Sequence, residues 1–108
     1  MDRQKLLKVL NLDSFIAIDF ETTGLDPIND RIIEVAAIKF KNGKVTDKYV
    51  QLINPELKIS SFITGITGIT NKMIKSCPTE EMIIDDFLYF LGKDPLVGHN
   101  IYFDDNFL

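Results

Sequence analysis

The chain has 108 residues and a mass of 12.3 kDa, which excludes a two-domain enzyme and predicts one domain or part of one. With 45% hydrophobic and 26% charged residues it can build a core, so the composition excludes a disordered chain. A formal net charge of −4 argues against a protein that coats long stretches of duplex DNA, and the single cysteine, Cys77, excludes an internal disulfide.

The first 13 residues alternate charged and aliphatic side chains. Their apolar run is too short and too interrupted for a signal peptide or a membrane span. We therefore expect residues 1–13 to be a leader, residues 14–108 to form the domain, and the protein to be cytoplasmic, without a membrane segment.

Three strands are predicted in the first half of the chain, over Phe15 to Glu21, Ile32–Lys41 and Lys44–Asn54. The first is a short apolar run that ends near Glu21, and Thr22–Asp30 follows as a loop. Asn42-Gly43 separates the other two strands, and this dipeptide is the strongest sequence signal for a two-residue hairpin turn. The three strands are therefore expected to be antiparallel.

Helices are predicted after Pro55, first as short segments over residues 60–65 and 70–74. A longer helix begins after Thr79, which can cap it, and its apolar residues repeat every three to four positions until Gly92. Leu96–His99 predicts a short buried strand, and Tyr102–Leu108 predicts the start of another helix.

These elements predict an α/β fold. Three antiparallel strands, a helical crossover and a further strand parallel to the first would form a mixed sheet with helices on one face. Such an architecture does not by itself define a function.

Two carboxylates, Asp19 and Glu21, stand two positions apart at the end of the first predicted strand. Both should leave the same face of the sheet while Phe20 points to the other face. Acids in this arrangement can share a pair of hard cations, although an isolated triplet of this kind also fits a solvated strand edge. The turn over residues 22–24 follows, with two hydroxyls and a glycine that lets a ligand approach the main chain.

A second polar cluster, Gly98 to Asp104, lies at the predicted junction between the last strand and the last helix. Sites in α/β sheets gather where strands end and helices begin. Asp104 is therefore a candidate site residue, although an acid in a first helical turn also suits the helix dipole alone.

Four separated stretches resemble the first two motifs of the DEDD superfamily of ribonuclease H-like 3′–5′ exonucleases, which includes the proofreading epsilon subunit of bacterial DNA polymerase III. In chain order they are Phe15–Asp26, Arg31–Ala37, Thr67–Thr70 and Val97–Leu108. The resemblance covers residues 15–108 and implies a ribonuclease H-like mixed sheet.

The resemblance also implies a set of site residues. Asp19, Glu21 and Asp104 would be catalytic and would bind two Mg²⁺ or Mn²⁺ ions at the scissile phosphate, as two-metal hydrolysis requires. The substrate-binding residues would be Thr22, Thr23 and Gly24 at the 3′-hydroxyl, Leu25, Ile66 and Thr67 at the terminal base, and Asn100 and Phe103 along the strand.

Two points stay open within this assignment. Leu25 and Ile66 would fit a hydrophobic core about as well as a substrate pocket. Glu34 falls at a family position where a substrate role competes with a salt bridge to Arg31 or a nearby lysine, and we favour the salt bridge.

The superfamily has a third motif that supplies a fourth acid and, in the histidine-type branch, a general base. Leu108 comes before such a motif could occur, and the only histidine, His99, belongs to the second motif. We therefore expect a truncated exonuclease that binds divalent metal weakly, is nearly inactive alone and self-associates through the uncovered side of its sheet.

The favoured interpretation is a proofreading-type exonuclease domain that acts on the 3′ end of single-stranded DNA, as a subunit of a replicative polymerase or alone. An exoribonuclease of the same superfamily that trims RNA is the first alternative. A non-catalytic module that binds nucleic-acid ends or serves in assembly is the second.

Overall fold

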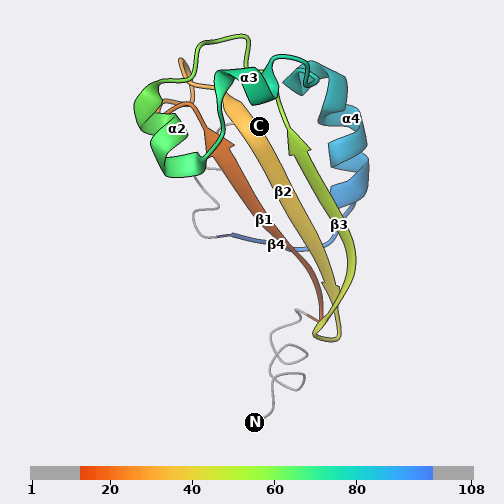
Figure 1. Ribbon diagram of the computed structural model, residues 1–108. Helices are drawn as coiled ribbons and strands as arrows, with labels where there is room; N and C mark the ends of the chain where they lie inside the picture. Colours follow the sequence, from red (N-terminus) through yellow and green to blue (C-terminus); the bar gives the residue numbers. More distant parts are fainter. Residues whose placement is uncertain (1–12, 99–108) are drawn as a thin grey trace.

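A computed structural model describes residues 13–98 (Figure 1). In chain order its elements are β1 (Ser14–Thr22), β2 (Ile32–Lys41), β3 (Lys44–Leu52), α2 (Ser61–Thr67), α3 (Asn71–Ile74), α4 (Glu80–Leu91) and β4 (Leu96–Val97). The predicted leader, except for its last residue, and the predicted final helix lie outside the described residues. No helix within residues 13–98 combines the length and the apolar character that a membrane crossing needs.

The strands form one mixed sheet in the order β3-β2-β1-β4. β1 pairs antiparallel with β2 and β2 with β3, whereas β4 pairs parallel with β1, with Ile16 opposite Leu96. The helices between β3 and β4 therefore form the crossover that parallel pairing requires. The predicted ribonuclease H-like α/β sheet is confirmed.

The hairpin between β2 and β3 turns at Asn42 and Gly43, whose φ angles are +52° and +79°. Glycine and asparagine tolerate this left-handed region better than other residues. Lys41 pairs with Lys44 directly across the turn, so the hairpin is the two-residue type that the sequence predicts.

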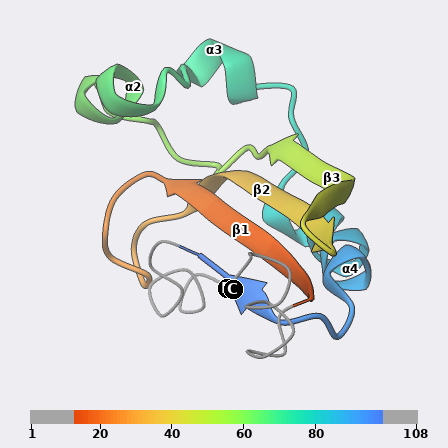
Figure 2. The same ribbon diagram turned by 90° about the horizontal axis from the view of Figure 1, so that it is seen from below.

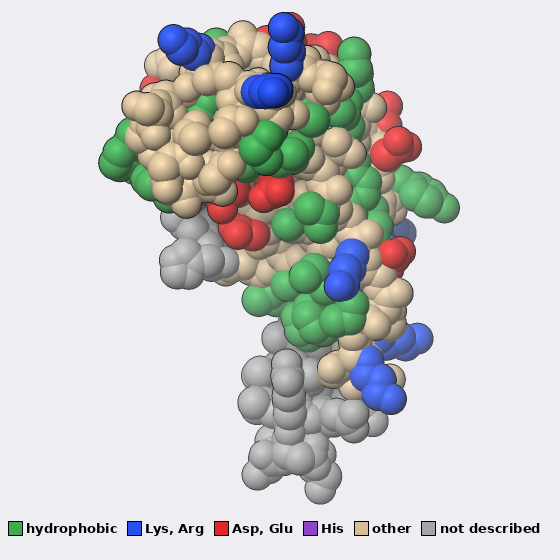
Figure 3. All heavy atoms as spheres, viewed as in Figure 1, with side chains coloured by type: hydrophobic (Ala, Val, Ile, Leu, Met, Phe, Trp, Pro, Cys, Tyr) green, Lys and Arg blue, Asp and Glu red, His purple; other side chains and the backbone are tan. Residues whose placement is uncertain are grey.

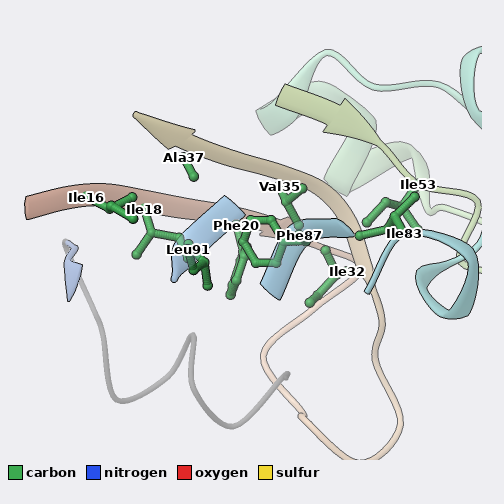
Figure 4. Close-up of a cluster of buried hydrophobic side chains, with 10 residues drawn as sticks. All are labelled: Ile16, Ile18, Phe20, Ile32, Val35, Ala37, Ile53, Ile83, Phe87 and Leu91. Carbon is green, nitrogen blue, oxygen red and sulfur yellow. The ribbon is translucent and has the colours of Figure 1, made fainter. Parts of the chain in front are cut away.

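The main core lies between one face of the sheet and α4 (Figure 4). Alternate residues of β1, namely Ile16, Ile18 and Phe20, point to this face and are buried. Phe87 of α4 is fully buried among them, with its ring centroid 6.1 Å from that of Phe20 and 5.4 Å from that of Tyr49 on β3. Because the core holds the even-numbered residues of β1, the odd-numbered residues of this strand point to the opposite face of the sheet.

α2 and α3 lie on the other side of the sheet from α4 (Figure 2). A second cluster of buried residues joins this segment to β2, through Ile33, Ile59, Ile69 and Ile74. The expectation that helices cover only one face was therefore wrong. We call one part of this second face the open face. It carries the odd-numbered residues of β1 and lies below α2 and α3 in the view of Figure 1.

A β-bulge at Ile33 changes which residues of β2 point to the open face. Glu21 pairs with Glu34 and Thr22 pairs with Ile32, so Ile33 has no partner on β1. Ile32 can therefore join the main core while Ile33 joins the second cluster. The bulge leaves Glu34 on the same face as Glu21.

The helix caps differ partly from expectation. Thr79 occupies the N-cap of α4 as predicted, but its side chain makes no cap hydrogen bond. Ser60 and Thr70 do cap their helices, because their hydroxyls accept from the backbone N–H groups of Ile63 and Met73.

Candidate active site

The two predicted acids lie together on the open face at the end of β1. Asp19 is exposed and Glu21 is half-buried, while Phe20 between them is in the core. Figure 3 shows acidic side chains gathered on this face below α2 and α3. The alternation of β1 thus places both carboxylates as the sequence predicts.

Glu34 adds a third carboxylate beside them. It lies directly across from Glu21 on β2, whereas Asp19 lies across from the small Ala36. Burial raises the pKa of Glu21, and the charges of Asp19 and Glu34 raise it further. The open face therefore concentrates negative charge that a bound cation would neutralise.

Of the partners favoured for a salt bridge of Glu34, Arg31 was wrong. The Arg31 guanidinium donates to the backbone carbonyls of Ile28 and Asp30, both at 2.9 Å. Burial raises the pKa of Glu80, and the charge of Arg31 partly offsets this effect, so Arg31 lies toward α4.

A cavity of about 530 Å³ opens beside the acids, between the end of β1 and α2. Its lining residues are Phe20, Glu21, Thr22, Thr23, Gly24, Leu25, Ser60, Phe62, Ile63, Ile66 and Thr67. The structure thus brings together every predicted substrate-binding residue that it describes. Asn100 and Phe103 lie outside the described residues.

The structure decides the open alternative for Leu25 and Ile66, and it shows lining residues that the sequence did not single out. Leu25 and Ile66 have exposed fractions of 83% and 66%, so the core alternative for them was wrong. Phe62 is 73% exposed and stands one helical turn before Ile66 on α2. That spacing was the available signal for Phe62.

The open face carries two of the carboxylates that are predicted to bind metal ions. Carboxylate oxygens are the ligands that Mg²⁺ and Mn²⁺ prefer, and Asp19 and Glu21 supply them from one strand. Within residues 13–98, no group of three or more His, Cys, Asp or Glu side chains is placed to hold a metal ion. The third predicted ligand, Asp104, lies outside this range, so the complete ligand set stays a prediction.

Sequence relatives of the chain are large bacterial polymerases. It is 47% identical over 94 residues to the DNA polymerase III PolC-type of Caldanaerobacter subterraneus, which covers 87% of this chain and 7% of that protein. It is 41% identical over 101 residues to the same enzyme of Bacillus subtilis, covering 94% of this chain and again 7% of the relative. The chain therefore spans less than a tenth of the length of these proteins.

Similar solved structures are exonucleases. A structure of exonuclease X in complex with 5′ overhanging duplex DNA has a TM-score of 0.74 and 31% identity, covering 87% of this chain and 53% of that one. A structure of Escherichia coli exonuclease I with a dT13 oligonucleotide has a TM-score of 0.74 and 26% identity, covering 88% and 22%. Residues 16–108 match the model of the family RNase_T, described as Exonuclease. The chain therefore belongs to this exonuclease family of the DEDD superfamily.

Proposed function

We propose that the chain forms part of a 3′–5′ exonuclease domain that hydrolyses terminal nucleotides of single-stranded DNA with the help of two divalent metal ions. The observation that carries this proposal is that Glu21 lines a cavity whose other walls are the residues expected to bind a strand end, with Asp19 two residues before it on the same strand. Family membership supports the same reaction class.

Asp19 and Glu21 would hold the metal ions together with Asp104. The pair fits this role, because Glu21 is half-buried next to two like charges and a cation would relieve their repulsion. Ions held there would supply Lewis-acid chemistry for a phosphoryl oxygen and would activate water at neutral pH. Mg²⁺ and Mn²⁺ both suit the oxygen ligands.

The cavity walls would hold the terminal nucleotide. The main chain and hydroxyls of Thr22, Thr23 and Gly24 can bind the 3′-hydroxyl, and Thr22 Oγ1 already donates to the Gly24 carbonyl, which fixes the turn. Leu25 and Ile66 present exposed apolar side chains on opposite walls, with Thr67 next to Ile66, and can press on the terminal base. Apolar contacts of this kind tolerate any base.

DNA is the favoured substrate over RNA. Two of the similar solved structures are exonucleases in complex with DNA, and the relatives in sequence are DNA polymerases. With a net charge of −4, the chain would bind phosphates through metal ions at the strand end rather than through a basic surface.

The same relatives favour a polymerase context for this chain. We propose a replicative DNA polymerase as its partner, and self-association through the side of the sheet that truncation would leave uncovered as the alternative. The sequence contains no histidine besides His99, so we expect residues 1–108 alone to lack the general base. Their hydrolysis should then be slow by about 10²–10⁴-fold relative to a complete site.

A degradation assay tests the proposed function. A single-stranded DNA labelled near its 5′ end is incubated with the chain in Mg²⁺, Mn²⁺ or EDTA, beside a matched RNA. We expect slow, metal-dependent shortening from the 3′ end of the DNA, abolished in Asp19→Asn and retained in Asp85→Asn, an exposed acid on α4. Shortening that persists in EDTA or in Asp19→Asn would contradict the proposal, and faster digestion of the RNA would favour the exoribonuclease alternative.

A further inference from the structure

The loop over residues 23–31 joins β1 to β2 and forms one wall of the cavity through Thr23, Gly24 and Leu25. Thr23 ties the two ends of this loop together. Its N–H donates to the Arg31 carbonyl at 2.8 Å, and its hydroxyl accepts from the Arg31 N–H at 2.9 Å. The ends of the loop are thus fixed to each other.

The carboxylate of Asp30 connects these fixed ends to the rest of the loop. One oxygen, Oδ1, accepts from the Thr23 hydroxyl at 2.9 Å, and the other, Oδ2, accepts from the Asp26 N–H at 3.0 Å. The Asp30 N–H in turn donates to the Asp26 carbonyl at 2.7 Å. Hydrogen bonds to an ionised carboxylate are stronger than neutral ones, so Asp30 is well placed to hold the loop in one shape.

Gly24 lies directly against this carboxylate. A Cβ atom at position 24 would stand 2.7 Å from Asp30 Cγ and 2.8 Å from Asp30 Oδ1, closer than real Cβ contacts allow. Only glycine therefore fits while the carboxylate keeps its place. The contact fixes the path of the main chain between Thr23 and Leu25, which is the part of the loop that faces the cavity.

We propose that Asp30 is a positioning residue that presets the surface of Thr23, Gly24 and Leu25 for the 3′ end of a strand. Asp30 is not one of the lining residues and acts through the main chain in front of it. A wall that is already ordered loses less conformational freedom when it binds a ligand. This inference rests on the proposed function, because it assigns the wall to a strand end.

The test compares two single-stranded oligothymidylates that differ only at the 3′ end, one with a hydroxyl and one with a phosphate. Their dissociation constants are measured in Mg²⁺ by fluorescence anisotropy. We expect the original chain to prefer the hydroxyl end. Asp30→Ala should weaken binding of the hydroxyl strand by about tenfold and leave binding of the phosphate strand unchanged. A tenfold effect is the order expected when the lost charged hydrogen bonds position the ligand-binding wall without touching the ligand.

Three further variants separate positioning from general damage. Asp30→Asn keeps one acceptor oxygen and should lose part of the preference, and Gly24→Ala should lose it by displacing the carboxylate. Asp26→Asn is the matched control, because its side chain accepts from Ile28 and Asn29 at the tip of the loop and not from Thr23. Circular dichroism identifies folded variants, and Asp30→Asn decides if Asp30→Ala does not fold.

The outcomes distinguish this inference from the proposed function. A folded Asp30 variant that keeps the full preference for the hydroxyl end would overturn the inference and leave the proposed function intact. An original chain without any preference between the two ends would overturn the assignment of the cavity to a strand end, and the inference with it. Equal loss in Asp26→Asn would also overturn the inference, because the effect would then belong to the loop in general.

Discussion

Glu21→Gln should stabilise the metal-free protein at neutral pH. Burial, Asp19 and Glu34 raise the pKa of Glu21 above its usual value of 4.5, so the folded state binds this proton more tightly than the unfolded state. Ionisation of Glu21 then opposes folding. This destabilisation is fully present at a pH above the pKa that Glu21 has in the folded state, and it disappears as the pH falls below 4.5.

The size of the effect follows from the positions of the charges. A like-charge pair directly across an antiparallel ladder, as Glu21 and Glu34 are, costs about 0.2–1 kcal/mol. Asp19 lies two residues along the strand, about 6.6 Å away at the usual rise. Two charges at that distance repel by about 0.6 kcal/mol in water. We therefore expect Glu21→Gln to add about 1 kcal/mol, or about 4 °C in Tm for a domain of this size.

Thermal unfolding in EDTA, followed by circular dichroism at pH 7 and at pH 4, measures this difference. The advantage of Glu21→Gln should be present at pH 7 and shrink toward pH 4, while Asp85→Asn on the outer side of α4 should change little. In Mn²⁺ the original chain should be more stable than Glu21→Gln, because only the original chain gains stability from binding the ion. A Glu21→Gln variant that is less stable in EDTA at pH 7, or whose advantage does not depend on pH, would refute the reasoning.

Three further predictions concern the scaffold. Phe87→Ala should cost about 3–5 kcal/mol in urea denaturation, because its ring is fully buried between the sheet and α4, and a loss below 1 kcal/mol would contradict that packing. Gly43→Ala should destabilise by about 1–2 kcal/mol because of its positive φ, whereas Gly65→Ala, inside α2 with open space around it, should stabilise by about 0.5–1 kcal/mol. The same sign for both glycines would be evidence against these backbone conformations. Ser60→Ala should cost about 0.5–2 kcal/mol because a cap hydrogen bond is lost, and Thr79→Ala should cost less, so equal losses in thermal melts would contradict the cap geometry.

Much of the fold could be predicted from local patterns. The alternation along β1 placed Asp19 and Glu21 on one face, and Asn42-Gly43 defined the hairpin, because both signals depend on residues that are neighbours in sequence. The apolar repeat of α4 likewise located its buried residues.

The rest depends on contacts between distant residues. The position of Glu34 beside Glu21 follows from the pairing register between β1 and β2, which the sequence of neither strand gives by itself. The role of Asp30 in the 23–31 loop follows from hydrogen bonds to Thr23 and Asp26, and an aspartate in a loop gives no such signal.

The cavity, too, could be predicted from the sequence only in part. Motif resemblance pointed to residues 22–25 and 66–67, and the structure brings these two segments together across one space. Phe62 shares that space with Ile66, one helical turn later on α2, but which side of this short helix faces the cavity follows from the tertiary structure.

We propose above all that Asp19 and Glu21 bind divalent metal ions on the open face, beside the cavity. The most direct measurement is the anomalous scattering of Mn²⁺ in crystals of the chain soaked with that ion. The account predicts anomalous density at the two carboxylates on the open face, lost in crystals of Asp19→Asn. Anomalous density elsewhere on the molecule, with none beside Asp19 and Glu21, would contradict it.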